Sequence, residues 1–387
     1  MLVLATTVPV ESGDGTPAFV LDLASALTDE MTVSILAPRV PEAARVTTID
    51  GVTVRRFGYF PRRWEGLANG AIMPTLRAEP WRWIEVPALV GAMIVRTVFE
   101  AWRTRADVLH AHWILPGGLA ASCAAALLRK PYIVTVHGAD VYTLRGRRIS
   151  WLKRKILTRA RAVMPVSQDI RSMVIDLAEA PDNITSAVPM GVAAPEVRDA
   201  GRRAADSFLI VGRLAQKKGI GIAINAFSMI DRGDLVVVGD GPLRSTLESA
   251  VDEANLNDRV RFVGRQPREE VLDHMRRCTA LLIPSVVAPD GDTDGTPVVL
   301  AEAMSLGTPV IASRIAGLAD HIEDGRTGWL VEPGDVEALA EALVRGMGDT
   351  SGLDRLGASA AQYFTGGALD MATTAREYRS VLRGLAP

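Results

Sequence analysis

The sequence predicts an α/β protein with two doubly wound parallel sheets, and three observations support this class. Short apolar stretches alternate with longer stretches of helical periodicity in the first half of the 387-residue chain. The alternation starts again in the second half, after a polar, Ala-rich patch. Glycines and polar residues follow several of the apolar stretches, and ligands bind at such strand ends in doubly wound sheets.

The first half contains one clear helix and one clear buried strand. Residues 17–28 carry Phe19, Leu23 and Leu27 four positions apart, which gives a helix one apolar face. Residues 132–136 form an apolar run, typical of a strand buried on both sides. The other elements expected here are strands at 1–5, 31–37, 52–57, 106–111 and 162–166, and helices at 117–129, 149–158 and 169–177.

The second half repeats this order of elements. We expect strands at 208–211, 235–238, 260–263, 280–283 and 309–312, and helices at 219–229, 243–254, 268–277 and 297–306. The pattern predicts an N-terminal Rossmann-like domain at 1–193, a linker at 194–206 and a C-terminal Rossmann-like domain at 207–366. Both domains would offer the loops after their strands to a cleft between them.

The composition excludes several classes of protein. The 43 Lys and Arg are balanced by 45 Asp and Glu, so no overall basic field indicates nucleic acid as a partner. Cys123 and Cys278 do not suggest a disulfide framework. The first apolar residues reach Pro9 without a basic region, which predicts a strand rather than a signal peptide. No run reaches the roughly 18 apolar residues needed to cross a bilayer, and we expect a cytoplasmic protein.

Two carboxylates bracket the start of the helix expected at 297–306. Pro297 is typical of a first helical position, so Asp294 lies just before the helix. Glu302 follows about two turns later, at about 3.6 residues per turn. Carboxylates accept hydrogen bonds from hydroxyl groups, which makes this loop a candidate site for a sugar.

Two cations lie in the turn after the strand expected at 208–211. Arg213 and Lys218 precede the helix expected at 219–229. The free N–H groups and the dipole of a helix N-terminus add to the charge of these side chains. We therefore expect an anion site that could neutralise a diphosphate leaving group.

These two stretches resemble the signatures of the retaining glycosyltransferases of family 4, which have the GT-B fold. In that family an acidic residue, usually Glu, is followed by Gly-x-Pro, and seven residues separate it from a second acidic residue, a Glu; here Asp294 and Glu302 stand at the two acidic positions. It also has a Gly-Arg-x4-Lys-Gly element, which residues 212–219 match. The motifs, in order along nearly the whole chain, look most like the bacterial exopolysaccharide and lipopolysaccharide (colanic-acid-type) branch.

The resemblance implies that the second domain holds a nucleoside diphosphate sugar as donor. Arg213 and Lys218 would bind the diphosphate and stabilise it as it departs. Asp294 would hold sugar hydroxyls and take part in catalysis, and Glu302 would hold the ribose. The other donor contacts that the family implies are Gly15, Gly212, Gly241, Arg265, Gly295, Thr296 and Pro297. No cofactor is implied.

The resemblance also assigns residues of the first domain to the acceptor side. His137 follows the strand at 132–136, and a His can donate a hydrogen bond to a sugar hydroxyl. The family implies that His137 contacts the transferred sugar as a catalytic residue, with Gly13, His112 and Asp140 on the acceptor side. Residues 367–387 would form a last helix that crosses back to the first domain.

Two features suggest a metal, and both have a weakness. Strand alternation places His110 and His112 on one side, but a third ligand is speculative. Asp292 and Asp294 form an Asp-x-Asp motif, which binds a divalent metal in the other glycosyltransferase fold. Here the motif lies in a loop that enters a helix, so we expect a metal-independent enzyme.

Residues 60–105 interrupt the alternation of strands and helices. They hold four Trp and seven Arg, a composition that suits a membrane interface or an amphipathic acceptor. The alternative is a helix pair packed on the first domain.

These observations predict the retaining transfer of a hexose to an acceptor hydroxyl, in polysaccharide or glycolipid synthesis. The acceptor would be a saccharide or a lipid-linked molecule, and the protein would contact the anionic inner face of a membrane peripherally. Two alternatives remain: a nucleotide-sugar 2-epimerase on the same fold, and a non-catalytic module that binds nucleotide sugars.

Overall fold

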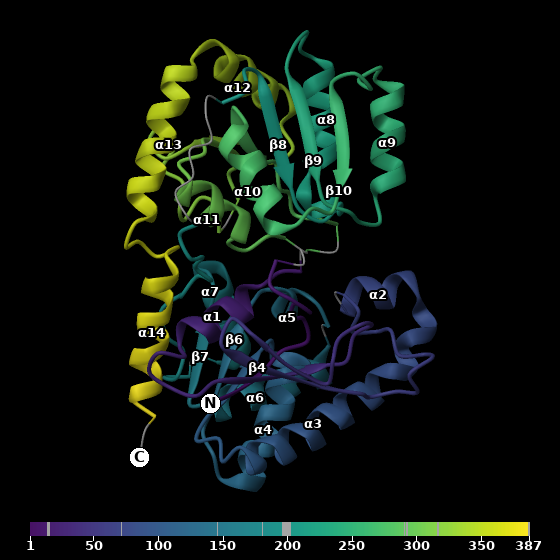
Figure 1. The fold of residues 1–387 in the computed structure, drawn as a ribbon, viewed down its shortest axis with the longest axis vertical. Helices are drawn as coiled ribbons and strands as arrows, with labels where there is room; N and C mark the ends of the chain where they lie inside the picture. Colours follow the sequence, from purple (N-terminus) through teal and green to yellow (C-terminus); the bar gives the residue numbers. More distant parts are fainter. Residues whose placement is uncertain are drawn as a thin grey trace. The chain divides into compact units, whose positions relative to one another are not determined.

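The chain forms two compact units, each built around one sheet (Figure 1). Met1–Pro189 and Thr374–Pro387 make up the first unit, and Met190–Thr373 makes up the second. The computed structural model describes residues 1–13, 16–70, 72–144, 146–179, 181–195, 203–289, 291, 293–315 and 317–385.

The first sheet has the strand order β3-β4-β2-β1-β5-β6-β7. Its strands are β1 (Leu2–Leu4), β2 (Ser34–Pro38), β3 (Val46–Ile49), β4 (Val52–Phe57), β5 (Leu109–His112), β6 (Tyr132–Val136) and β7 (Ala162–Pro165). All neighbours are parallel except β3, which pairs antiparallel with β4 at the edge. The chain builds outward from β1 in both directions, so the loops after β1 and β5 meet at a switch point, where ligands bind in such sheets.

The helices of the first unit are α1 (Phe19–Ala26), α2 (Ile72–Ala78), α3 (Glu85–Arg103), α4 (Leu119–Leu128), α5 (Ala139–Tyr142), α6 (Arg147–Arg159) and α7 (Gln168–Ala178), with single turns at Pro80–Ile84 and Ile114–Gly118. Helices α3 and α4 pack side by side (Figure 1). The last helix, α14 (Met371–Arg383), lies against this unit, where Tyr378 is fully buried. Its hydroxyl lies 2.7 Å from the Thr135 hydroxyl of β6.

The second sheet has the order β10-β9-β8-β11-β12-β13, and all its pairs are parallel. Its strands are β8 (Ser207–Val211), β9 (Asp234–Val238), β10 (Val260–Gly264), β11 (Ala280–Ile283), β12 (Val310–Ser313) and β13 (Trp329–Val331). Its helices are α8 (Ile220–Ser228), α9 (Arg244–Glu253), α10 (Arg268–Arg277), α11 (Val298–Ser305), α12 (Val336–Gly348) and α13 (Thr350–Phe364), with a turn at Gln216–Lys218.

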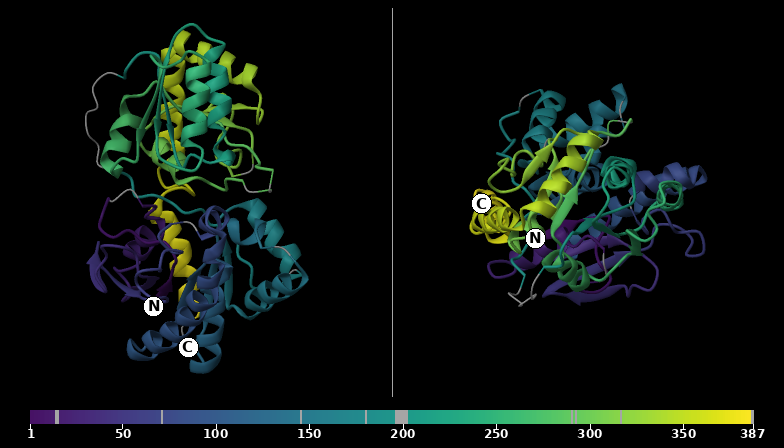
Figure 2. Two further views of the ribbon diagram at one scale, coloured as in Figure 1. Left: turned by 90° about the vertical axis from the view of Figure 1, so that its right-hand side faces the viewer. Right: turned by 90° about the horizontal axis from the view of Figure 1, so that it is seen from above.

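Helices cover both faces of the second sheet (Figure 2). On one face, Phe208 and Val237 pack with Phe227 of α8 and Leu343 of α12. On the other face, Leu281 and its neighbours pack with α10, α11 and the end of α13. Successive residues of one strand therefore pack into the cores on opposite faces of the sheet. This explains why the strands appear in the sequence as continuous apolar runs.

The predicted fold class, with two parallel sheets of Rossmann type, is confirmed. Two strands were missed: β13, which has three residues, and β3, whose four residues are mostly exposed or partly exposed. β3 forms a hairpin with β4 through Asp50 and Gly51, which both have positive φ angles. An Asp-Gly pair is the usual signal of such a two-residue hairpin.

Candidate active site

An ion pair joins the two central loops of the second unit. β8 and β11 are neighbours in the sheet, although β9 and β10 separate them in sequence. Lys218, in the turn after β8, places its Nζ 2.8 Å from Oδ2 of Asp294, in the loop after β11. Lys217 Nζ lies 3.7 Å from Oδ1 of the same carboxylate. The pair marks the switch point of this sheet, where a ligand is expected.

Asp294 is held as a buried anion. Only 7% of its surface is exposed, and the buried Ser285 hydroxyl donates to Oδ2 over 2.7 Å. Burial alone would raise the pKa of Asp294, but Lys218, Lys217 and the hydrogen bonds outweigh it and lower this pKa. Asp294 therefore stays ionised at neutral pH, as an acceptor of hydrogen bonds from hydroxyl groups.

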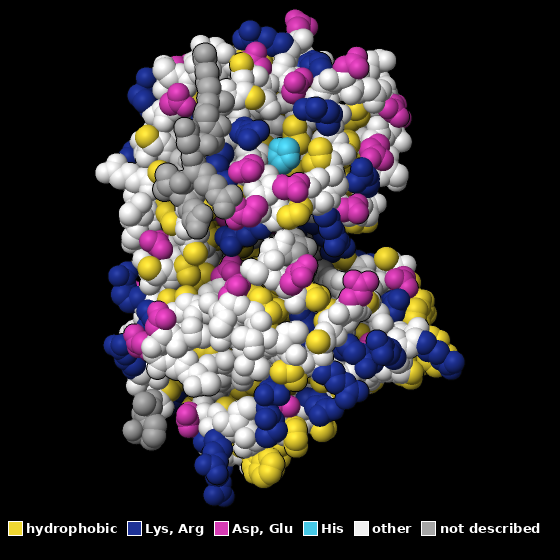
Figure 3. Space-filling view, in the orientation of Figure 1, with side chains coloured by type: hydrophobic (Ala, Val, Ile, Leu, Met, Phe, Trp, Pro, Cys, Tyr) yellow, Lys and Arg dark blue, Asp and Glu magenta, His cyan; other side chains and the backbone are white. Residues whose placement is uncertain are grey.

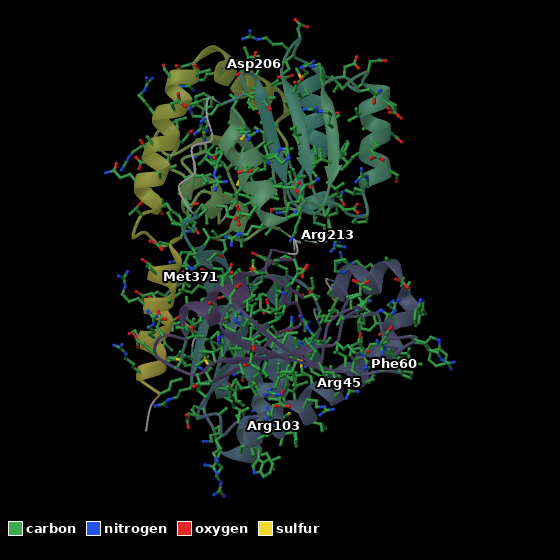
Figure 4. The ribbon with its side chains drawn as sticks, viewed as in Figure 1. Arg45, Phe60, Arg103, Asp206, Arg213 and Met371 are labelled. Carbon is green, nitrogen blue, oxygen red and sulfur yellow. The ribbon has the colours of Figure 1, made fainter. Side chains whose placement is uncertain are left out.

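Glycines allow the turns after β8 and β9 to touch backbone to backbone. A Cβ on Gly239 would lie 1.9 Å from the carbonyl oxygen of Gly212, and one on Gly241 would lie 2.5 Å from that of Leu214. Arg213 lies between these contacts, and its side chain is exposed at the edge of the sheet toward which the strands point (Figure 4). The close approach thus presents Arg213 at the same edge as Lys218.

A third glycine positions the loop before α11. A Cβ on Gly317, at φ +81°, would lie 2.5 Å from the carbonyl carbon and oxygen of Gly295 and 2.9 Å from the Thr296 nitrogen. Pro297 has extended backbone, and α11 starts after it. The predicted donor contacts Gly295, Thr296 and Pro297 therefore depend on Gly317 for their place beside Asp294.

The other two predicted donor residues lie on neighbouring elements. Glu302, inside α11, is largely buried and accepts a hydrogen bond from Arg268 Nε over 3.0 Å. Arg265 is exposed and follows β10, two strands away from β8. The structure thus gathers Lys218 and Asp294 closely, whereas Arg265 lies further along the sheet edge.

In the first unit, three histidines gather where β5 and β6 end. His110 and His112 are buried on β5, with ring centroids 4.4 Å apart. The rings of His112 and His137 stack at 5.1 Å, and His112 Nδ1 lies 2.9 Å from His137 Nε2. Desolvation lowers the pKa of His110 and of His137 to about 3, and that of His112 also falls well below its usual value. All three rings are neutral at pH 7.

The hydrogen bond between His112 and His137 has a preferred direction. A neutral imidazole has one donor and one acceptor nitrogen. His112 Nε2 is buried and has no hydrogen-bond partner among the described residues. A buried N–H without an acceptor is especially rare in folded proteins, which favours a proton on His112 Nδ1. His112 Nδ1 then donates to His137 Nε2, and His137 carries its own proton on Nδ1.

Asp140 ties together the loops that follow β5 and β6. It is buried, and it accepts hydrogen bonds from the backbone N–H groups of Ile114 and Gly138, both over 3.0 Å. Burial raises the pKa of this carboxyl group. Asp140 therefore holds the backbone on both sides of the histidine pair.

Two aromatic rings that were not predicted flank His137. Trp113 lies 4.8 Å from the His137 ring, and Phe19, at the start of α1, lies 5.1 Å from it. Trp113 has φ +66° and ψ 142°, a backbone conformation that is strained for any residue except glycine and is often found at functional sites. Gly13 is exposed in the loop after β1, and Gly15 lies outside the described residues.

Metal ligands do not gather in the described part of the chain. No group of three or more His, Cys, Asp or Glu side chains there could hold a metal ion. Asp292, half of the Asp-x-Asp motif, lies outside the described residues. The Asp294 carboxylate instead forms ion pairs with Lys217 and Lys218.

Sequence reasoning missed Lys217, Ser285 and Arg268, which contact the predicted carboxylates. Lys217 adjoins Lys218 and was overlooked because the motif counts only one lysine. Ser285 directly follows the apolar stretch and Pro284, so its position at the end of a buried strand was the available signal.

Two families of known proteins match the chain. Residues 14–191 match the "Glycosyl transferase 4-like domain", and residues 202–363 match "Glycosyl transferases group 1". The amylovoran biosynthesis glycosyltransferase AmsK of Erwinia amylovora is 32% identical over 253 residues, which cover 62% of this chain and 61% of AmsK. This match spans less than two thirds of the length of AmsK.

A second relative and a solved structure cover more of the chain. The 2-deoxystreptamine glucosyltransferase of Streptomyces kanamyceticus is 31% identical over 293 residues, which cover 68% of this chain and 73% of that enzyme. The structure of HepE from Anabaena in complex with UDP-glucose superposes with a TM-score of 0.72 over 99% of this chain and 99% of HepE, at 17% identity. That likeness shows the shared fold.

Proposed function

Because the chain belongs to glycosyltransferase family 4, the group 1 glycosyl transferases of GT-B fold, we propose that it transfers a hexose from a nucleoside diphosphate sugar to an acceptor hydroxyl. The transfer would retain the configuration at the anomeric carbon, as in the family. The observation that carries this proposal is the ion pair of Lys218 with the buried Asp294 at the switch point of the second sheet.

The charges of this cluster suit a diphosphate. Arg213, Lys217 and Lys218 carry three positive charges, and Asp294 carries one negative charge. The surplus of two charges would stabilise a departing nucleoside diphosphate, in which negative charge develops as the sugar leaves. Asp294 Oδ1, at 3.7 Å from Lys217 Nζ, keeps lone pairs for a sugar hydroxyl, while Oδ2 is engaged by Lys218 and Ser285.

The remaining roles follow the family and the chemistry of the residues. Glu302 would bind the ribose, with Arg268 fixing its orientation. His137, with a proton on Nδ1, would donate to a hydroxyl of the transferred sugar, and His112 and Asp140 would hold it in place. Among the residues that the structure describes, we see no carboxylate placed as a nucleophile. The proposed attack therefore occurs on the same face, and the leaving phosphate takes the acceptor proton.

The reaction would need no metal, because lysines and an arginine provide the positive charge that a divalent ion provides elsewhere. We propose that the donor is a UDP-hexose, because HepE was solved with UDP-glucose and the Streptomyces relative is named a glucosyltransferase. The acceptor would be a saccharide or lipid-linked molecule in polysaccharide synthesis at the cytoplasmic face of the membrane, given that AmsK is named for amylovoran biosynthesis.

The test measures release of nucleoside diphosphate from a panel of donors, with and without saccharide acceptors and with and without EDTA. A transferase releases the diphosphate faster when acceptor is present, and EDTA leaves the rate unchanged. A 2-epimerase would interconvert two donors without any acceptor, and a binding module would bind donors without turnover. Absence of release with every donor would contradict the proposal, and a rate lost in EDTA and restored by manganese would contradict metal independence.

A further inference from the structure

Helix α3 has an apolar stripe on its outer side. Its inner side buries Leu89 and Met93 toward the rest of the unit. On the outer side Ile84, just before the helix, and Val95 are both 66% exposed, and Phe99 and Trp102 are 44% and 68% exposed. These positions lie on one side of a helix with about 3.6 residues per turn. The predicted alternative, a helix pair packed on the first domain, thus describes only the inner side of α3.

The tryptophans of the first unit are unusually exposed. Five of the seven tryptophans of the chain are between 49% and 68% exposed, and all five belong to the first unit: Trp64, Trp81, Trp83, Trp102 and Trp151. Trp is usually among the most buried residues on average, so this grouping needs a reason. Tryptophan side chains are enriched at the interface between a membrane and water, where one edge of the ring is apolar and the other is wet.

The charges beside the stripe are positive. Residues 60–105 contain seven Arg and four Glu. Each of the four Glu forms an ion pair with an arginine: Glu65 with Arg39, Glu79 and Glu85 with Arg82, and Glu100 with Arg103. Arg62, Arg63, Arg77, Arg96 and Arg105 are exposed. Figure 3 shows basic and hydrophobic side chains together along the edge of the first unit where α3 runs, and Figure 4 labels Arg103 at the end of this helix.

We propose that this surface, the α3 face (Trp81, Trp83, Ile84, Val95, Phe99 and Trp102 with the neighbouring arginines), binds the surface of a membrane that contains anionic phospholipids. The apolar stripe would lie at the boundary between head groups and acyl chains, and the arginines would contact anionic head groups. No helix in the described ranges is long and apolar enough to cross a membrane, so α3 would lie along the surface. The inference does not depend on the donor chemistry of the second unit.

Two variants of the full chain separate the apolar and the electrostatic contributions. The apolar variant combines Val95→Ser, Phe99→Ser and Trp102→Ser, all at exposed positions. The charge variant combines Arg96→Glu and Arg105→Glu. Arg82 and Arg103 are left unchanged, because they neutralise the buried Glu85 and Glu100 and their loss would disturb the fold. The matched control replaces Met229 and Val344, which are 55% and 52% exposed in the second unit, by Ser.

The measurement is sedimentation with vesicles of phosphatidylcholine alone or mixed with phosphatidylglycerol, at low and at high salt. We expect the unchanged protein and the control to sediment with the anionic vesicles and to be released by salt. The apolar variant should lose this binding. The charge variant should bind at least about 25-fold more weakly, at about 5-fold for each arginine removed.

Circular dichroism of each variant shows whether it is folded. A folded charge variant that binds as well as the unchanged protein would overturn the proposal. So would an unchanged protein that sediments with neither kind of vesicle, and the α3 face would then fit a protein partner instead.

Discussion

Lys218 and Asp294 form a 2.8 Å ion pair between loops that lie 76 residues apart in the sequence. The pair exists because β8 and β11 are neighbours in the sheet, so the loops that follow them leave the same edge side by side. The adjacent Lys217 has a similar side chain but a longer contact with the same carboxylate, 3.7 Å. The two lysines therefore form a natural pair for comparison.

We predict that Lys218→Ala lowers kcat by about 100-fold or more, the usual cost of losing one preorganised group that stabilises developing charge. Lys217→Ala should cost about 10-fold or less, because its contact is longer. Lys217→Ala should unfold at nearly the same urea concentration as the unchanged protein, whereas Lys218→Ala should unfold at a lower one, because it leaves the buried Asp294 without its nearest cation. Equal rates for Lys218→Ala and the unchanged enzyme, in the assay of diphosphate release, would contradict the assignment.

A second prediction concerns the hydrogen bond that His112 donates to His137. His112→Ala removes it, and we expect kcat to fall about 10-fold, the cost of one lost hydrogen bond of about 1.4 kcal/mol. His112→Asn places an amide N–H near the position of Nδ1, so it should recover much of this loss. If the Asn and Ala variants are equally slow although both are folded, His112 acts by packing and not by donating a hydrogen bond to His137.

A third prediction follows from the neutral histidines. The pKa of His110 is about 3 in the folded protein, below an unfolded value of about 6.5. The unfolded chain therefore binds more protons between these values, and stability falls as the pH drops below about 6.5, by up to about 1.4 kcal/mol per pH unit for each such histidine.

Urea unfolding at about pH 7 and about pH 5 checks this slope, followed by Trp fluorescence. Trp113 lies beside His137 in the first unit, and Trp329 is buried in the second unit, so the fluorescence reports the unfolding of both units. His110→Gln can keep a hydrogen bond to Thr135 but does not titrate, so its stability should depend less on pH. An equally steep loss in this variant would show that other groups cause the acid sensitivity.

A fourth prediction uses two glycines of similar backbone conformation. Gly317 and Gly325 have φ angles of +81° and +76°, but a Cβ at Gly325 would meet nothing within 4 Å. Both Ala variants should lose about 1 kcal/mol of stability from backbone strain. Gly317→Ala should also displace Gly295 and Thr296 and raise the KM for the donor about 10-fold, an effect of about 1.4 kcal/mol on binding. A normal KM in Gly317→Ala would show that the position of this loop does not affect donor binding.

The sequence predicted the fold class because its parallel strands are buried on both faces. All five residues of β6 are buried, for example, so the strand appears as an apolar run. β3 gave no such run, since it is a mostly exposed edge strand, and its signal was the turn at Asp50 and Gly51. Spacing along the chain thus revealed strands with two buried faces and missed β3 and the short, partly exposed β13.

The candidate site was predictable where a single motif contains its residues. Lys218 and Asp294 were each found in their own stretch of sequence, and the structure brings them together. The contact of Arg268 with Glu302 was not predictable, because it joins α10 to α11 across a face of the sheet. The same holds for Trp113 and Phe19 beside His137, which meet only because β1 and β5 are adjacent strands.

Because Tyr378 lies near the C-terminus, the core of the first unit is completed late in protein synthesis. This fully buried residue packs on His110 and bonds to Thr135, which precedes it by 243 residues. The ribosome therefore makes every strand of the first sheet, and then the whole second unit, before the helix that covers β5 and β6 exists. Until then the nascent chain carries an incomplete core, and domains in that state are prone to aggregate. Chaperone dependence should consequently persist until α14 leaves the ribosome, long after the strands that it covers.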